Sequence, residues 1–126
     1  MKPPDTRAVS ESAAERVVPS ERFFEIDMRV GRVVECAPVP QARRPAYRML
    51  IDFGELGRRT SSARVTDNYT PAQLIGSLVV AVVNLPARQV GQVRSEVLVV
   101  GAYQHGSERV ALLRPDGDCS VGDRIG

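Results

Sequence analysis

Arginine is the residue type in this sequence that is best placed to do chemistry, because its positions are clustered. Sixteen of the seventeen basic residues are arginine, and six of these lie between residues 43 and 64. Only Asp52 and Glu55 oppose them, so six positive charges against two leave this stretch at +4, whereas the whole chain carries +2. Arginine pairs bidentately with phosphate and stacks on nucleobases. The cluster therefore predicts a surface for a polyanion. GC-rich codons are an alternative reason for arginine over lysine, but they do not explain the clustering.

A second set of polar residues lies between two apolar runs in the stretch NLPARQVGQVRSEVLVVG, residues 84–101. We expect Arg88 and Arg94 to lie on a loop and to reach phosphate, with Ser95 beside them. Asn84 could read a base edge or a sugar with its amide group, or it could simply end a strand. The carboxylate of Glu96 repels phosphate. We therefore expect Glu96 to accept hydrogen bonds from one of the arginines and to order the loop, with a contact to amino groups of a base as the alternative.

No set of residues in the sequence has the composition of a catalytic or metal site. His105 is the only histidine and has no acidic partner at a telling spacing, while Ser61 and Ser62 have no base to activate them. Cys36 and Cys119 are far apart and outside any recognisable ligand spacing, so we expect reduced thiols. The sequence thus predicts a protein that is not an enzyme and that uses neither a metal nor a cofactor.

Length and composition limit the architecture that positions these residues. A chain of 126 residues is expected to form one domain with a core of its own. The core must be aliphatic, because there is no tryptophan and only 5% of the residues are aromatic. Residues 1–20 are poor in large apolar groups, so we expect a flexible tail before a domain at 21–126. The sequence has neither an apolar run long enough to cross a bilayer nor a secretory signal, which predicts a cytoplasmic protein without membrane insertion.

Two short helices are expected. Ser20 is a candidate cap for a helix that ends at Phe24. The segment TPAQLIG, residues 70–76, has a threonine cap, a proline at the first helical position, a glutamine at the capping-box position and a glycine stop. This second segment carries the most complete local helix signal of the chain.

Strands occupy most of the remaining sequence. Gly31 lies within a valine-rich run and suggests a bulge or bend, which in small barrels lets the first strand serve both sheets. Turn residues recur about every ten positions, as is typical of small closed β folds. We therefore predict an all-β fold with short helices, a small OB-like β-barrel, with strands at 28–37, 47–53, 58–65, 77–85, 96–102, 110–114 and 121–125.

Four segments in the right order and spacing together resemble one family. These are FFEIDMRVGRVVECAPVP at 23–40, TSSARVTDNYTPAQLIGSLVVAVVNLP at 60–86, the N-x-P…S-E-V-L pattern at 84–98, and LLRPDGDCSVGDRIG at 112–126. The pattern resembles the tRNA-binding domain family in its CsaA-type branch, over residues 22–126. Three positions depart from it: Ala87 replaces a proline, Gln89 replaces a basic residue, and Gln92 replaces a glycine. The loop therefore carries less positive charge than the family pattern.

The resemblance implies an OB-like RNA-binding module for structured RNA, tRNA foremost, that acts as a symmetric homodimer. The N-terminal helix and the C-terminal segment are the expected dimer contacts. The alternative is an export-related chaperone that binds unfolded preprotein segments in the same groove. An RNA-binding protein needs its arginines on the groove face, whereas a peptide-binding protein needs apolar pockets there. The predicted RNA-binding residues are Arg43, Arg44, Arg58, Arg59, Arg64, Asn84, Arg88, Arg94 and Ser95, with Glu96 ordering the loop.

Overall fold

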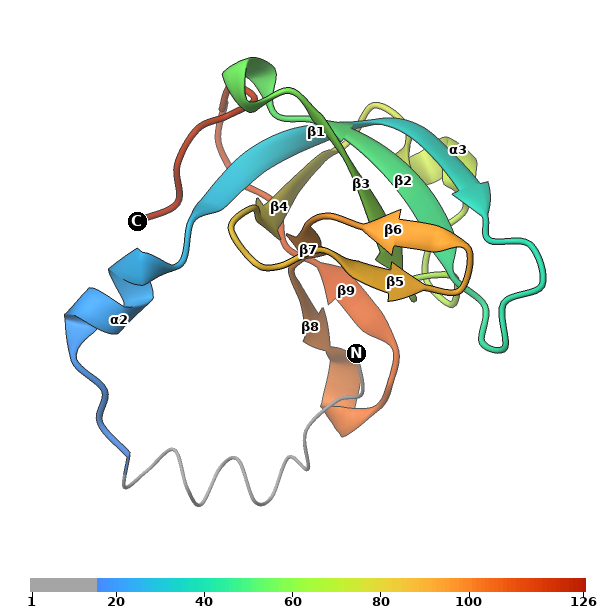
Figure 1. Ribbon diagram of the computed structural model, residues 1–126, viewed down its shortest axis with the longest axis horizontal. Coiled ribbons are helices and arrows are strands. Elements are labelled where there is room, and N and C mark those ends of the chain that lie inside the picture. Colours follow the sequence, from blue (N-terminus) through green and yellow to red (C-terminus); the bar gives the residue numbers. More distant parts are fainter. Residues whose placement is uncertain (1–15) are drawn as a thin grey trace.

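The strands of this chain wrap into a small, nearly closed barrel (Figure 1). The computed structural model describes residues 16–126, so most of the predicted tail lies outside the described residues. Five strands form the main sheet in the order β3-β2-β1-β4-β7, and two hairpins, β5-β6 and β8-β9, complete the wall. The elements are α2 (Ser20–Glu25), β1 (Met28–Pro38), β2 (Tyr47–Asp52), η1 (Gly54–Leu56), β3 (Arg58–Ala63), α3 (Pro71–Leu74), β4 (Leu78–Val82), β5 (Arg88–Val90), β6 (Val93–Ser95), β7 (Leu98–Val99), β8 (Gly101–Tyr103), η2 (Gln104–Gly106) and β9 (Val110–Leu112).

Strand β1 belongs to both halves of the barrel. Its first half pairs with β4 and its second half pairs with β2, both antiparallel. Gly31 lies where the strand crosses the core. A Cβ there would stand 2.5 Å from Ile51 and 2.7 Å from Phe53, so no larger residue fits without a shift. The register shift that marks a bulge falls between Val33 and Glu35, a few residues beyond the predicted glycine.

The barrel closes between β3 and the segment that follows the β5-β6 hairpin. The Glu96 amide donates to the Thr60 carbonyl at 2.8 Å, and the Thr60 amide donates back to Glu96 Oε1 at 3.0 Å. Two residues further along β3, the Ser62 amide donates to Ser95 Oγ at 3.1 Å. Two side chains thus satisfy main-chain donors that a continuous β ladder would otherwise satisfy.

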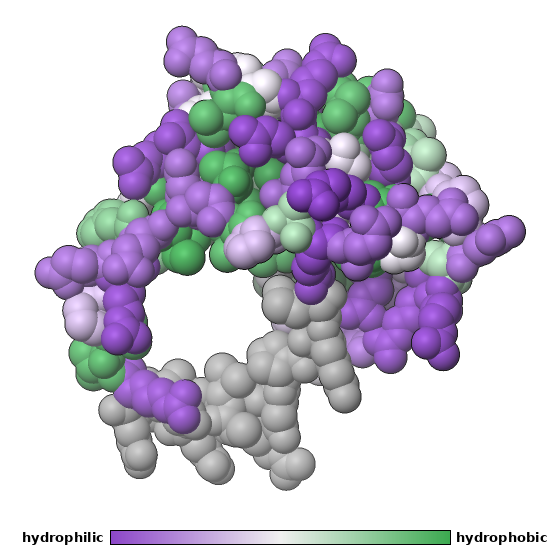
Figure 2. All heavy atoms as spheres, viewed as in Figure 1, coloured by the Kyte–Doolittle hydropathy of each residue, from purple (hydrophilic) through white to green (hydrophobic). Residues whose placement is uncertain are grey.

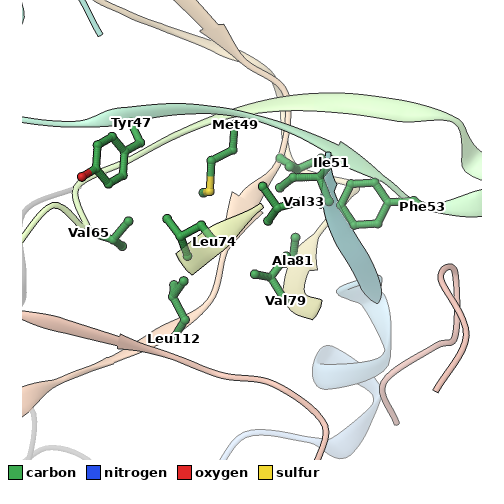
Figure 3. Packing of buried hydrophobic residues seen from close by; sticks show 11 residues of the cluster. Val33, Tyr47, Met49, Ile51, Phe53, Val65, Leu74, Val79, Ala81 and Leu112 are labelled. Carbon is green, nitrogen blue, oxygen red and sulfur yellow. The ribbon is translucent and has the colours of Figure 1, made fainter. Parts of the chain in front are cut away.

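The core inside the barrel is aliphatic, as the composition requires. Met49, Ile51, Phe53 and Leu74 are completely buried and pack with valines of β1 and β4 (Figure 3). Ser61 also points inward and is 1% exposed, and its hydroxyl has no hydrogen-bond partner among the described residues. Burial of such an unpaired hydroxyl costs stability.

Both predicted helices are present, but only α3 has the cap that its sequence predicts. At α3 the complete capping box is present: Thr70 Oγ1 accepts from the Gln73 amide, and Gln73 Oε1 accepts from the Thr70 amide. Helix α2 is also present, but Ser20 is its first helical residue and Pro19 occupies the cap position without a side-chain hydrogen bond. Ser20 is therefore not the cap that its residue type suggested. No helix within residues 16–126 is long and apolar enough to cross a membrane.

Two strand predictions and one loop prediction need correction. The segment 121–125 is not a strand, because a turn at Gly122, with φ of 90°, interrupts it, although its main chain still bonds to β1 through Val30 and Met28. The predicted strand 96–102 is split into β7 and β8. The residues predicted as a loop after Asn84 instead form the β5-β6 hairpin, which turns at Gly91 with φ of 60°.

Candidate nucleic-acid interface

The loop between β1 and β2, residues 39–46, carries the first two predicted arginines. Arg43 and Arg44 are both exposed. The loop is closed by a hydrogen bond from the Val39 amide to the Ala46 carbonyl at 2.9 Å. Val39 and Ala46 are buried together with Val93 of β6 in a small cluster outside the main core. This packing holds the arginine-bearing loop against the β5-β6 hairpin.

The hairpin separates the two arginines that the sequence placed together. Arg88 pairs with Ser95, and Gln89 pairs with Arg94. Residues directly opposite each other in an antiparallel pair share a face, and successive residues alternate faces. Arg88 therefore lies on the face of buried Ser95, whereas Arg94 points to the opposite, solvent face.

Strand β3 divides its arginines in the same way. Arg58 is exposed opposite Asp52, while Arg59 is half-buried opposite the core residue Ile51. Neighbouring positions in a strand point to opposite faces, so these two arginines cannot share a surface. Arg64 lies just beyond the other end of β3, roughly 20 Å along the chain from Arg58 at strand spacing. The cluster in the sequence is thus not one patch in the structure.

Three of the predicted arginines do meet. Arg44, Arg64 and Arg88 come from the β1-β2 loop, the end of β3 and the β5-β6 hairpin, and all three line one pocket of about 550 Å³. We call it the arginine pocket. Asp67 and Glu108 are its acidic members, and Arg44 Nη1 lies 3.4 Å from Glu108 Oε1, with both side chains about 60% exposed. The other lining residues are Pro45, Ser62, Ala63, Val65, Thr66, Leu98, Val99, Val100, Gly101, Tyr103, Val110 and Leu112.

The floor of the arginine pocket is part of the barrel core. Val65 and Leu112 are buried members of the core cluster, and Ala63, Val99 and Val110 are half-buried and pack against it. The pocket therefore opens onto apolar side chains and is rimmed by guanidinium groups. Nothing in the sequence marks these floor residues as part of a site. Each lies in an ordinary apolar run, and only the folded barrel shows that the run borders an opening.

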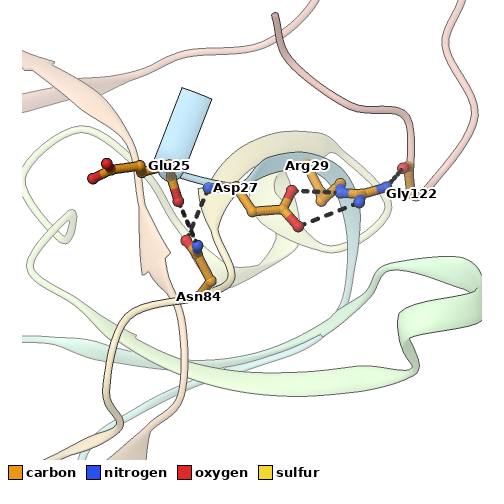
Figure 4. Close-up of polar contacts among 5 residues, drawn as sticks. All are labelled: Glu25, Asp27, Arg29, Asn84 and Gly122. Carbon is orange, nitrogen blue, oxygen red and sulfur yellow. Dashed lines mark hydrogen bonds and ion pairs between the residues drawn. The ribbon is translucent and has the colours of Figure 1, made fainter. Parts of the chain in front are cut away.

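Asn84 follows β4 and lies where helix α2 joins β1 (Figure 4). Its Oδ1 accepts from the Asp27 amide at 2.8 Å, and its Nδ2 donates to the Glu25 carbonyl at 2.7 Å. Both ends of the amide thus bind main chain, and the end of β4 is tied to the helix junction. This geometry matches the strand-end alternative from the sequence and leaves Asn84 outside the arginine pocket.

Asp27 and Arg29 reinforce the same junction. Arg29 Nε and Nη2 donate to the two Asp27 oxygens at 2.6 and 3.2 Å, and Arg29 Nη1 donates to the Gly122 carbonyl at 3.0 Å (Figure 4). The hydrogen bond from Arg29 holds the pKa of the Asp27 carboxyl below its usual value, and the same bond raises the pKa of Arg29. The ion pair orients the Arg29 guanidinium, and its hydrogen bond to Gly122 fastens β1 to the C-terminal segment.

Ser95 and Glu96 have structural partners in the closed barrel. Ser95 is 6% exposed, and its hydroxyl accepts from the Ser62 amide and donates to the Val97 carbonyl at 3.3 Å. Glu96 binds the main chain of Thr60, whereas the expected partner was an arginine. Within residues 16–126, Arg88 and Arg94 form no ion pair, so Glu96 does not hold either of them.

The titratable groups of the described residues do not form a metal centre. No cluster of three or more histidine, cysteine, aspartate or glutamate side chains is present between residues 16 and 126. Cys36 and Cys119 are unpaired thiols in this part of the chain, and burial raises the pKa of the Cys36 thiol, which favours its protonated form. The residues that line the arginine pocket offer hydrogen-bond donors, acceptors and apolar surface.

The known proteins that this chain resembles include methionine–tRNA ligases and CsaA chaperones. Residues 28–124 match the family described as "Putative tRNA binding domain". The methionine–tRNA ligase of Porphyromonas gingivalis is 34% identical over 128 residues, which cover 96% of this chain but only 18% of that enzyme. The methionine–tRNA ligase of Thermotoga maritima is 30% identical over 90% of this chain and 18% of its own length. This chain thus spans about a fifth of the length of these relatives.

Two solved structures cover nearly all of the described fold. The CsaA chaperone of Bacillus anthracis is 42% identical with a TM-score of 0.81, and covers 88% of this chain and 100% of its own. The CsaA chaperone of Picrophilus torridus is 40% identical with a TM-score of 0.80, over 87% of this chain and 100% of its own. Residues 28–124, which match the family, contain every strand of the barrel and all residues of the arginine pocket. The chain therefore belongs to the tRNA-binding domain family.

Proposed function

We propose that this protein binds structured RNA, tRNA foremost, through the arginine pocket and the exposed arginines next to it. The observation that carries the proposal is the convergence of Arg44, Arg64 and Arg88, from three separate segments, on one opening in a fold of the tRNA-binding family. Two of the three segments, the β1-β2 loop with Arg44 and the chain after β4 that leads to Arg88, correspond to the loops with which OB-folds bind nucleic acids. Arg43, on the same loop as Arg44, extends the cationic rim.

Binding would rest on charge and shape, and it requires no chemical step. Guanidinium groups neutralise phosphates and release counterions, so affinity falls as salt rises. The remaining predicted arginines, Arg58, Arg59 and Arg94, do not line the arginine pocket and would reach only an RNA that wraps around the barrel. Asn84 and Ser95 also lie outside it and bind main chain. A cytoplasmic location would bring the protein into contact with tRNA and is part of the proposal. Catalysis is not.

A homodimer is the assembly that we propose, with helix α2 in the contact. The helix projects from the barrel and has no buried residue (Figure 1). Phe23 and Phe24 pack edge to face with centroids 5.4 Å apart, and Phe24 is 57% exposed. Hydrophobic side chains are visible on this projecting segment (Figure 2). A partner copy would cover these rings and double the number of arginine pockets, which raises avidity for a folded RNA.

Light scattering tests the dimer directly. The protein at tens of micromolar should have twice the mass of one chain, and Phe24→Glu, which puts a charge into the proposed contact, should give the mass of a monomer. Glu21→Gln, on the same helix, is the matched control and should remain dimeric. A wild-type monomer at this concentration would contradict the proposal.

A second function, polypeptide binding by a chaperone, is favoured by one specific observation. The floor of the arginine pocket is apolar, which is what an extended, unfolded preprotein segment needs. Two structures with 42% and 40% identity are of proteins described as CsaA chaperones. We rank this function below RNA binding because three of the pocket's five charged residues are arginines.

A mobility-shift titration separates the two functions. The protein is titrated against total tRNA at 50 and 200 mM salt, and in parallel against a reduced, unfolded polypeptide. RNA binding predicts a tRNA complex at the lower salt that weakens by about tenfold or more at the higher salt if two phosphates are contacted. The absence of a tRNA complex at 50 mM salt, with intact binding of the polypeptide, would contradict the proposed function and favour the chaperone.

A further inference from the structure

The arginine pocket combines two surfaces that a phosphate backbone alone does not need. Its rim holds Arg44 and Arg88, whereas its floor is formed by apolar side chains that also belong to the core, among them Val99 and Val110. A duplex RNA that is bound only through its phosphates would use the rim and leave the floor exposed to water. An exposed apolar concavity costs free energy and marks a place where a ligand excludes water.

A single nucleotide matches the dimensions and the mixed chemistry of the arginine pocket. A volume of about 550 Å³ lies within the range of small-molecule sites, which is roughly 300–1,000 Å³. A single nucleotide is anionic at its phosphate and flat and apolar at its base, and the pocket has the same division. Thr66, Asp67 and Tyr103 also line the pocket, and their side chains carry hydroxyl and carboxylate groups of the kind that bind the polar edge of a base.

We propose that the arginine pocket takes one unstacked nucleotide from a single-stranded segment of the bound RNA, with its base against the apolar floor and its phosphates on the arginine rim. This inference rests on the proposed RNA binding and names the part of the RNA that the site reads. Bases in single-stranded loops and ends can turn outward and enter a pocket, whereas bases inside an A-form duplex are stacked and paired. The protein therefore prefers RNA with an unpaired segment over a blunt duplex.

Ala63 offers a substitution that tests the floor without touching an arginine. Its side chain is half-buried, lies on the inner face of β3 opposite Tyr47, and lines the arginine pocket. Ala63→Leu adds apolar volume to the space that the base would occupy. Val110→Thr keeps the shape of the floor but makes it polar, and it serves as the second variant if the larger side chain prevents folding.

The experiment measures the affinity of the wild type and both variants for three RNA probes at one salt concentration. The probes are total tRNA, a single-stranded hexanucleotide with one 2-aminopurine, and a blunt-ended duplex of two complementary strands without unpaired bases. Ala63→Leu should weaken hexanucleotide binding by about fivefold or more, the size expected when one stacked base is lost, and change duplex binding by less than about twofold. Val110→Thr should act in the same direction with a smaller effect. The 2-aminopurine fluorescence should change on binding to the wild type and change less with Ala63→Leu.

The possible failures are distinguishable. If the wild type binds tRNA but Ala63→Leu leaves the hexanucleotide affinity and fluorescence unchanged, or weakens hexanucleotide and duplex equally, the nucleotide pocket is wrong while RNA binding stands. If no RNA probe binds the wild type, the proposed function itself is wrong. If Ala63→Leu impairs only the binding of an unfolded polypeptide, the pocket belongs to a peptide ligand and the inference is overturned.

Discussion

Ser61 and Ser95 form a natural pair for testing how the barrel closes. Both hydroxyls are buried, with exposures of 1% and 6%. The Ser95 hydroxyl joins β6 to β3 by accepting from the Ser62 amide and bonds Val97 as well, whereas the Ser61 hydroxyl has no partner among the described residues. Ser95→Ala removes the acceptor of a main-chain amide in a half-buried position, and a polar group left unpaired costs about 1–3 kcal/mol.

For Ser61 the same reasoning predicts that substitution does not lower the free energy of unfolding. Ser61→Ala removes a hydroxyl that is already unpaired, so the free energy of unfolding should stay the same or rise by up to about 1 kcal/mol. Urea titrations give both values, and an unchanged denaturant slope shows that the two-state comparison holds. In thermal melts, Ser95→Ala should lower the melting temperature by roughly 4–12 °C at about 4 °C per kcal/mol. A loss for Ser61→Ala as large as that for Ser95→Ala would refute the account of β3–β6 closure.

Three further predictions follow from the junction and the core. Asn84→Ala should lower the free energy of unfolding by about 1 kcal/mol and speed proteolytic cleavage next to α2, because the amide loses its main-chain bonds; unchanged proteolysis would contradict its role as a tether. Since the pKa of Asp27 in the folded protein lies below 3.8, its ordinary value in an unfolded chain, the stability from its pair with Arg29 is present above pH 3.8 and is lost as pH falls through the folded pKa. Asp27→Asn should therefore flatten the acid limb of the stability profile, and an unchanged limb would argue against the pair. Gly31→Ala should cost about 1–3 kcal/mol in a urea titration because its Cβ meets Ile51 and Phe53, and a neutral result would show that β1 can shift.

Local signals in the sequence predicted the elements whose cause is itself local. The capping box of α3 is complete because its two partners lie three residues apart in the chain. The barrel class followed from the recurrence of apolar runs and turns. The strand predicted at 121–125 was wrong because hydrophobic content alone does not distinguish a strand from an extended segment with a turn at Gly122.

The candidate site was harder to predict because it depends on strand register. Arg88 and Arg94 are close in sequence, yet a two-residue turn places them on opposite faces of one hairpin. Arg58 and Arg59 are separated by the alternation of β3. The apolar floor could not be predicted from the sequence, since its residues are of the same aliphatic types as those of the core. Only the fold shows which arginines share an opening with it.

The separation of Arg88 from Arg94 offers the most direct test of the central claim that RNA binds at the arginine pocket. The measurement is tRNA affinity against salt concentration for the wild type, Arg88→Ala and Arg94→Ala, which carry the same charge change on opposite faces of one hairpin. Arg88→Ala should weaken binding and lower the log–log salt slope by roughly 0.7–0.9, the value for one lost phosphate contact, while Arg94→Ala should change both less. Equal losses for the two variants, or a larger loss for Arg94→Ala, would contradict the account.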